Sequence, residues 1–174
     1  MVIAKLQSAG VAALLAAGLV FSASAGAGAQ EAKEEGVAGD WIYTCQVPEG
    51  GSRECVLSQT LVAQETRKPI GRINIGRDQK STTLMLAVLL PLGLDIPRGV
   101  QADIDDRVKL ILRIETCVPS GCIARTPLDK KAVDSLKRGN RLNVGFRMQG
   151  GTETLFLPGS LTGISSGLAS TGLE

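Results

Sequence analysis

The sequence Leu84-Met85-Leu86-Ala87-Val88-Leu89-Leu90, followed by Pro91-Leu92-Gly93, decides the fold. It is the longest apolar run outside the N-terminus. Seven uncharged residues that end at a proline and a glycine fit a strand buried on both faces better than a helix. Because such a strand needs covering layers, we expect the neighbouring segments to be strands as well.

Much of the remaining chain alternates apolar and polar residues with the period of two that is typical of half-buried strands. The 21 glycines and seven prolines supply many turns between these stretches. We therefore predict an all-β, antiparallel β-sandwich. Aromatic residues make up only 3% of the chain, so leucine, isoleucine and valine must fill the core. The predicted strands lie at residues 41–47, 55–61, 70–76, 84–90, 100–104, 108–115, 142–148 and 154–157.

One short helix is expected near 127–138. Thr126 is the predicted N-cap, Pro127 suits the first helical position, and Gly139 ends the helix. Residues 161–173 are rich in glycine and serine. Their pattern leaves a packed helical turn and a loose tail open.

The N-terminus has the three parts of a secretory signal peptide: Lys5, an apolar centre and small residues. We predict a signal peptide at 1–29, cleaved after Ala29 or Ala25, and a flexible spacer at 30–40. A single β-sandwich domain follows at 41–174, in which 171–174 is a candidate tail. The mature protein is then periplasmic, extracellular or on the cell surface, with no transmembrane segment.

Four cysteines behind a signal peptide predict two structural disulfides. Three connectivities are possible, and we predict the local pairs Cys45–Cys55 and Cys117–Cys122, because each pair flanks turn residues. The first pair can face across a hairpin within bridging range. The spacings do not match the C-x2-C pattern of zinc sites or the C-x-x-C pattern of redox pairs.

The chain contains no histidine. This absence excludes Ser-His-Asp triads, Cys-His pairs and histidine-based zinc sites. The formal net charge of +2 does not favour nucleic acid as a partner. We predict a protein without catalytic residues, cofactor or metal.

Two charged clusters have weaker functional interpretations. A basic group could bind an acidic partner, but a solvated hairpin edge explains it better. Asp103, Asp105 and Asp106 suggest calcium, yet they lack the glycine and distant glutamate of an EF-hand loop, so a polar turn is favoured. The basic group consists of Arg67, Lys68, Arg72, Arg77 and Lys80.

An ordered set of short motifs resembles the invasion-associated locus B family of alphaproteobacteria, over residues 41–165. The resemblance implies a small exported β-sandwich and carries no established catalytic residues. The family is named after members linked to host-cell invasion, but it also occurs in bacteria that invade nothing. Gly159 departs from the family pattern, where an apolar residue is expected. The motifs comprise Trp41 with Cys45, Cys55-x-Leu57-x-Gln59, Leu90 to Leu94, Arg98 to Val100, Cys117 with Gly121-Cys122, and Leu157 to Gly163.

We therefore expect a non-enzymatic envelope or secreted domain that assists contact with a host cell or an envelope component. One alternative is a small-ligand or lipid carrier, which requires an apolar cavity between the layers. A second is a carboxylate-based hydrolase that uses Asp95, Asp103 or Glu115, which requires two acids about 5–10 Å apart in a cleft.

Overall fold

The computed structural model describes residues 33–79 and 81–174. The predicted signal peptide lies outside the described residues. No helix in the described part of the chain is long and apolar enough to cross a membrane. The strands and helices are β1 (Glu34–Ala38), β2 (Trp41–Gln46), β3 (Glu54–Val62), β4 (Pro69–Arg77), β5 (Leu84–Leu90), η1 (Ile96–Arg98), β6 (Val100–Ile104), β7 (Val108–Val118), β8 (Gly121–Pro127), α1 (Lys130–Arg138), β9 (Arg141–Phe146), β10 (Leu155–Ser160) and α2 (Ile164–Thr171).

The apolar run forms β5 with the predicted bounds, and it lies between β4 and β8. Leu84, Leu86, Val88 and Leu90 point into the core and are buried. The intervening side chains on the outer face are only half-buried. The prediction of burial on both faces is therefore wrong for the outer face, because the covering layer is supplied on one side alone.

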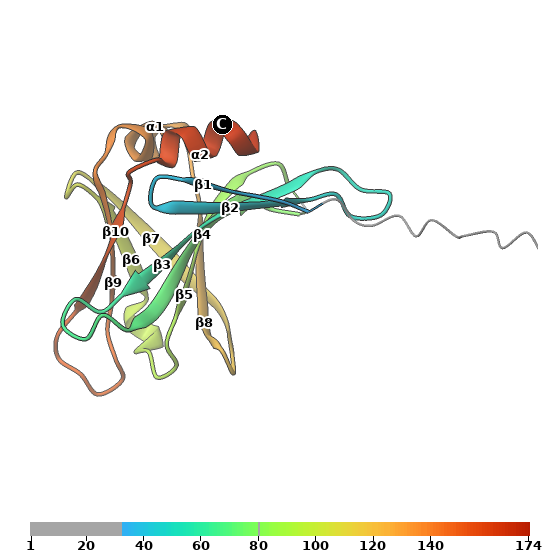
Figure 1. Cartoon of the computed structure of the whole chain (residues 1–174). Helices are drawn as coiled ribbons and strands as arrows, with labels where there is room; N and C mark the ends of the chain where they lie inside the picture. The colour runs from blue at the N-terminus through green and yellow to red at the C-terminus, as the bar shows by residue number, and fades with distance from the viewer. Residues whose placement is uncertain (1–32, 80) are drawn as a thin grey trace, which may run out of the picture. The chain divides into compact units, whose positions relative to one another are not determined.

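The described strands form one antiparallel sheet in the order β1-β2-β3-β4-β5-β8-β7-β6-β9-β10. The sheet curls so that β10 comes back to the side of β3 (Figure 1). The all-β antiparallel prediction is confirmed, and the layers of the predicted sandwich are parts of one curled sheet. Right-handed twist and a bulge in β7, where the register shifts between Ile114 and Thr116, favour this curling.

A buried glutamine joins the two ends of the curl. The Gln59 side-chain amide donates to the carbonyl oxygens of Asp40 and Ser160 at 3.1 and 3.0 Å, and its oxygen accepts from the Ser160 N–H at 2.7 Å. The indole N–H of Trp41 donates to the same Ser160 carbonyl at 3.0 Å. These bonds hold β10 against β3 and the β1–β2 turn, with which β10 shares no strand ladder in the described part of the chain.

The flexible spacer predicted at 30–40 is wrong over Glu34–Ala38, which forms edge strand β1. Glutamate and glycine have low strand propensity, but pairing with β2 overrides it. A two-residue turn, with Gly39 at a φ of +60°, connects the two strands. Gly36 lies directly against the Tyr43 ring, which would have to move to make room for a side chain.

The predicted helix exists as α1, but its predicted start is wrong. Thr126 and Pro127 continue β8, and Asp129 is the N-cap, with its carboxylate accepting from the Ala132 N–H at 2.7 Å. Gly139 follows the last helical residue, as predicted.

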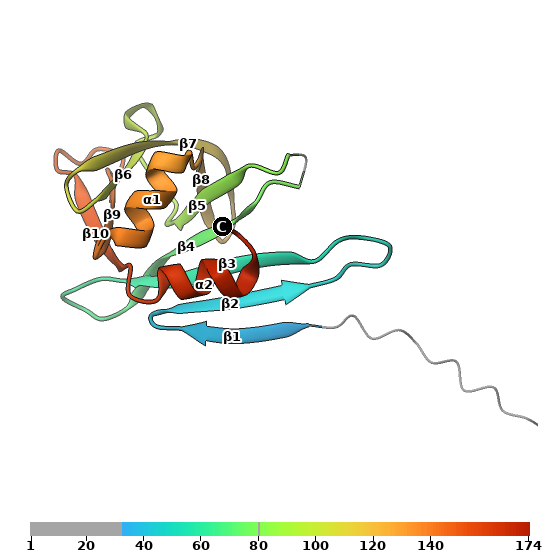
Figure 2. The same ribbon diagram turned by 90° about the horizontal axis from the view of Figure 1, so that it is seen from above.

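The C-terminal segment, which the sequence left open, contains helix α2. Ile164, Leu168 and Leu173 are buried, so the apolar residues of this segment belong to the core. Gly172 ends the helix with a φ of +68°, a conformation that favours glycine. Both helices lie at one end of the curled sheet (Figures 1 and 2).

Candidate functional site

Both predicted disulfides are present in the structure, and together they pair all four cysteines. Cys45 and Cys55 are direct cross-strand partners on β2 and β3, and both are buried. Cys117 and Cys122 close the β7–β8 hairpin, with Cys117 exposed and Cys122 buried. Each bridge links strands that are already neighbours, as expected for structural disulfides.

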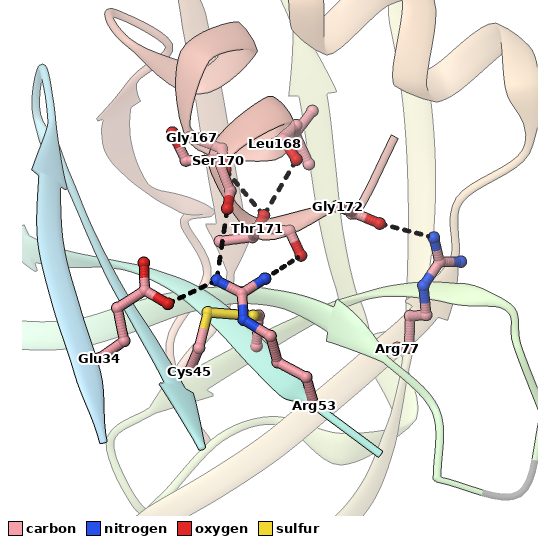
Figure 3. Close-up of a disulfide and its surroundings, with 10 residues drawn as sticks. Glu34, Cys45, Arg53, Arg77, Gly167, Leu168, Ser170, Thr171 and Gly172 are labelled. Carbon is pink, nitrogen blue, oxygen red and sulfur yellow. Dashed lines mark hydrogen bonds and ion pairs between the residues drawn. A yellow bond between two sulfur atoms is a disulfide. The ribbon is translucent and has the colours of Figure 1, made fainter. Parts of the chain in front are cut away.

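A cleft of about 450 Å³ lies beside the Cys45–Cys55 bridge, between the β3 and β4 ends and the end of α2. Arg53 and Arg77 line it, and we call it the two-arginine cleft. Figure 3 shows both guanidinium groups directed toward the last residues of α2. Arg53 donates to the Thr171 and Ser170 carbonyls at 3.4 and 3.5 Å, and it pairs with Glu34 at 2.8 Å.

Arg77 completes this arrangement by donating to the Gly172 carbonyl at 3.0 Å and to the Thr82 carbonyl at 2.9 Å. The last carbonyls of a helix have no intrahelical partner and carry the negative end of the helix dipole, so cations there are stabilising. Glu54 and Asp78 also line the cleft, which therefore contains both charges. The two arginines of the cleft are best explained as residues that cap the C-terminal end of α2.

Asp103 and Glu115, two of the three carboxylates considered for hydrolysis, lie too far apart to form a catalytic pair. Asp103 lies opposite Lys109 on β7, six residues before Glu115. At about 3.4 Å per strand residue, this separates the two acids by roughly 20 Å, well beyond the spacing of a catalytic pair. Glu115 pairs with Arg125 at 3.4 Å, and Asp95 lies 4.0 Å from Arg98.

The acidic turn after β6 is a polar turn in which the carboxylates accept backbone hydrogen bonds. Asp103 accepts from the Asp106 N–H at 3.1 Å, and Asp105 accepts from the N–H groups of Asn140 and Arg141 at 3.0 and 2.9 Å. Asp105 and Asp106 have φ values of 50° and 58°. Within residues 33–79 and 81–174, no group of three or more cysteine or carboxylate side chains is placed to hold a metal ion.

The basic residues around β4 do not form a hairpin edge, because β4 pairs with β3 on one side and β5 on the other. That part of the interpretation is wrong. Arg77 belongs to the cap of α2, and Lys80 lies outside the described residues. Arg72 is exposed on the outer face.

The space inside the curled sheet is occupied by side chains. Trp41, Leu57, Ile73, Leu86 and Leu142 are all fully buried there. Gly159 belongs to the same packing: an added Cβ would lie 2.8 Å from Ile73 and 3.1 Å from the Gln59 amide oxygen. A side chain at this position would crowd Ile73 and Gln59, which accounts for a glycine where an apolar residue is expected. This filled interior does not favour the carrier alternative.

Comparison with known proteins identifies the relatives of this fold. A family model described as "Invasion associated locus B (IalB) protein" matches residues 41–172. The chain belongs to this family. The matched range contains all four cysteines and every strand from β2 onward.

Individual relatives of the IalB family agree with this assignment. An invasion protein B homolog of Brucella abortus is 31% identical over 105 residues, which is 60% of each chain. Invasion protein B of Bartonella bacilliformis is 25% identical over 109 residues, 62% of this chain and 57% of the relative. The chain thus spans about 60% of the length of these relatives.

A solved structure has the same fold. The crystal structure of invasion associated protein B from Bartonella henselae matches with a TM-score of 0.68 and 22% identity, covering 80% of this chain and 95% of the other. At this identity the likeness concerns the fold.

Proposed function

We propose that this IalB-family chain is an exported, non-catalytic binding domain of the cell envelope. It acts in the periplasm or at the cell surface, where it assists contact with an envelope component or a host cell. The proposal that the protein is exported rests on one observation: all four cysteines are paired in disulfides. Disulfides of this kind persist in oxidising compartments and are rare in the cytosol.

Three further features support this proposal, one each for the absence of catalysis, for export and for a contact role. The two arginines that line the two-arginine cleft cap a helix, and Asp103 and Glu115 lie too far apart to form a catalytic pair. The signal-like sequence at 1–29 supports export. The relatives are named as invasion proteins, which suggests a host-facing contact for those relatives and, by proposal, for this chain.

Export is tested on the protein made by its own bacterium. Cells are fractionated, free thiols are blocked with iodoacetamide before and after reduction, and the intact mass is measured. We expect the protein in the periplasmic or surface fraction, with a mass that lacks the leader and with no thiol labelled before reduction. Cytoplasmic protein with four labelled cysteines would contradict the proposal.

The partner is tested by crosslinking on intact cells, with and without host cells. We expect a crosslinked partner that is absent when an unrelated periplasmic protein carries the same tag. Recovery only of periplasmic or peptidoglycan-associated proteins would contradict the host-facing version and retain the envelope version. The absence of any specific crosslinked partner in both conditions would contradict the binding role.

A further inference from the structure

The sheet opens between β7 and β8. Their ladder runs from the Val118–Gly121 pair to the Arg113–Arg125 pair and stops there. β7 nevertheless begins five residues earlier, at Val108, and β8 continues to Pro127. Among the described strands, the first residues of β7 therefore pair with β6 on one side and with none on the other.

The direction of the unpaired backbone groups follows from the β6 register. The Asp105 N–H donates to the Arg141 carbonyl, so alternation along β6 turns Ile104, Ala102 and Val100 toward β7. Their partners Val108, Leu110 and Leu112 thus use their backbone groups on β6. The N–H and C=O groups of Lys109, which lines the opening, point the other way, toward the end of β8.

The opposite side of the opening lacks an equivalent free edge. The Leu128 N–H donates to the Leu84 carbonyl, which turns the backbone groups of Leu128 and Thr126 toward β5. Pro127 is then the residue that faces the opening, and proline has no N–H to leave unpaired. Of the two strand edges at the opening, only the edge of β7 can both donate and accept backbone hydrogen bonds.

The opening is a groove of about 500 Å³ with apolar walls and two lysines on its rims, one of which, Lys109, has Asp103 as its cross-strand neighbour. Val108, Leu110 and Leu128 contribute the apolar walls. Lys109 and Lys131 also line it, are exposed, and make no ion pair among the described residues. The one carboxylate of the lining, Asp129, is the N-cap of α1 and already accepts the Ala132 N–H.

We propose that this β7 groove binds an extended, acidic peptide segment of a partner protein by adding it as a strand to β7. The inference rests on the proposed binding function and assigns it a site. Main-chain bonds to Lys109 supply the attachment, which is the usual basis of strand addition. Alternate side chains of the peptide face the half-buried Val108 and Leu110, and the acidic ones are attracted by Lys109 and Lys131.

The probe for this inference is a fluorescein-labelled hexapeptide of alternating glutamate and valine. Its binding to the full mature domain is measured by fluorescence anisotropy at low salt. The matched variants are Lys109→Ala and Lys109→Pro, which both remove the charge but differ in the N–H that points into the groove. We expect Lys109→Ala to weaken binding a few-fold and Lys109→Pro to weaken it at least tenfold further.

Two altered peptides separate the contribution of charge from that of the main-chain hydrogen bonds. A lysine–valine peptide should bind at least tenfold more weakly than the glutamate–valine peptide, and so should a glutamate–valine peptide methylated on alternate backbone nitrogens. Circular dichroism and urea unfolding establish that both variants are folded. If Lys109→Pro fails to fold, the methylated peptide carries the same test on the unchanged protein.

Saturable binding that is lost in Lys109→Pro and with the methylated peptide supports the inference. No binding of the glutamate–valine peptide, or equal binding by Lys109→Ala and Lys109→Pro, overturns it. The whole-cell crosslinking described above tests the proposed function separately from these peptide measurements. A partner that still crosslinks to Lys109→Pro would place the binding surface elsewhere and leave the proposed function intact.

Discussion

Replacing Gln59 by leucine tests whether side-chain hydrogen bonds close the curled sheet. Gln59 has 9% of its surface exposed, and leucine is of similar size, so the change removes polar contacts with little change in volume. It eliminates the two bonds that the amide donates to Asp40 and Ser160 and the one that it accepts from Ser160. The Ser160 carbonyl keeps its bond from Trp41.

The expected loss follows from these three bonds. At a net value of about 1 kcal/mol each, they contribute roughly 3 kcal/mol. The Ser160 N–H and the Asp40 carbonyl also lose partners, while the buried leucine returns about 1 kcal/mol of apolar stabilisation. We expect the free energy of unfolding to fall by about 2–4 kcal/mol, a large fraction of the 5–15 kcal/mol that is typical of natural domains.

Urea unfolding followed by Trp41 fluorescence measures this change, because Trp41 is the only tryptophan and is fully buried. The matched control is Ser58→Ala on the adjacent β3 position, which removes one part-buried hydrogen bond to Asn74 and should cost no more than about 1 kcal/mol. Amide exchange at Ser160 should accelerate in Gln59→Leu alone. Equal stability of the two variants, with unchanged Ser160 exchange, would refute the reasoning.

Three further changes test the structure. Replacing Cys45 and Cys55 together by serine should lower the free energy of unfolding by about 3 kcal/mol in urea, because the closed loop no longer restricts the unfolded chain; unchanged stability would contradict a structural role. Gly159→Ala should cost about 1–3 kcal/mol through overpacking against Ile73, and a neutral effect would mean that the core adjusts there. Arg77→Ala should cost only about 0.5–1 kcal/mol, since the side chain is exposed, but amide exchange in α2 should accelerate; unchanged exchange would argue against the cap.

The parts of the fold that the sequence predicts are those determined by local pattern. β5 has the predicted bounds because its apolar run ends abruptly at Pro91. The Cys45–Cys55 pair follows from a hairpin whose turn residues are visible in the sequence. Strand β1 was missed because Glu34, Glu35 and Gly36 resemble a linker, and only the partner strand makes them extended.

The closure of the sheet depends on contacts that no local pattern reveals. Gln59 and Ser160 are separated by 101 residues, and Gln59 reads as an ordinary polar position of an alternating strand. Its burial requires the curl, which in turn depends on the bulge in β7 and the twist of the whole sheet. The family pattern marks Gly159 as unusual. The crowding by Ile73 and Gln59 that explains the glycine exists only in the closed structure.

The β7 groove shows why a binding edge is harder to predict than a strand. The alternation of β7 is the same whether its second edge is paired or free, because side-chain pattern reports the two faces of a strand and says nothing of its edges. Pro127 is the one local sign of the opening. It fits the first position of a helix and the unpaired edge of a strand equally well, since neither needs an N–H. The sequence predicts Pro127 as the first residue of the helix, but in the structure Pro127 pairs with Met85 and belongs to strand β8. The free edge of β7 therefore becomes visible only when the end of the β7–β8 ladder is known.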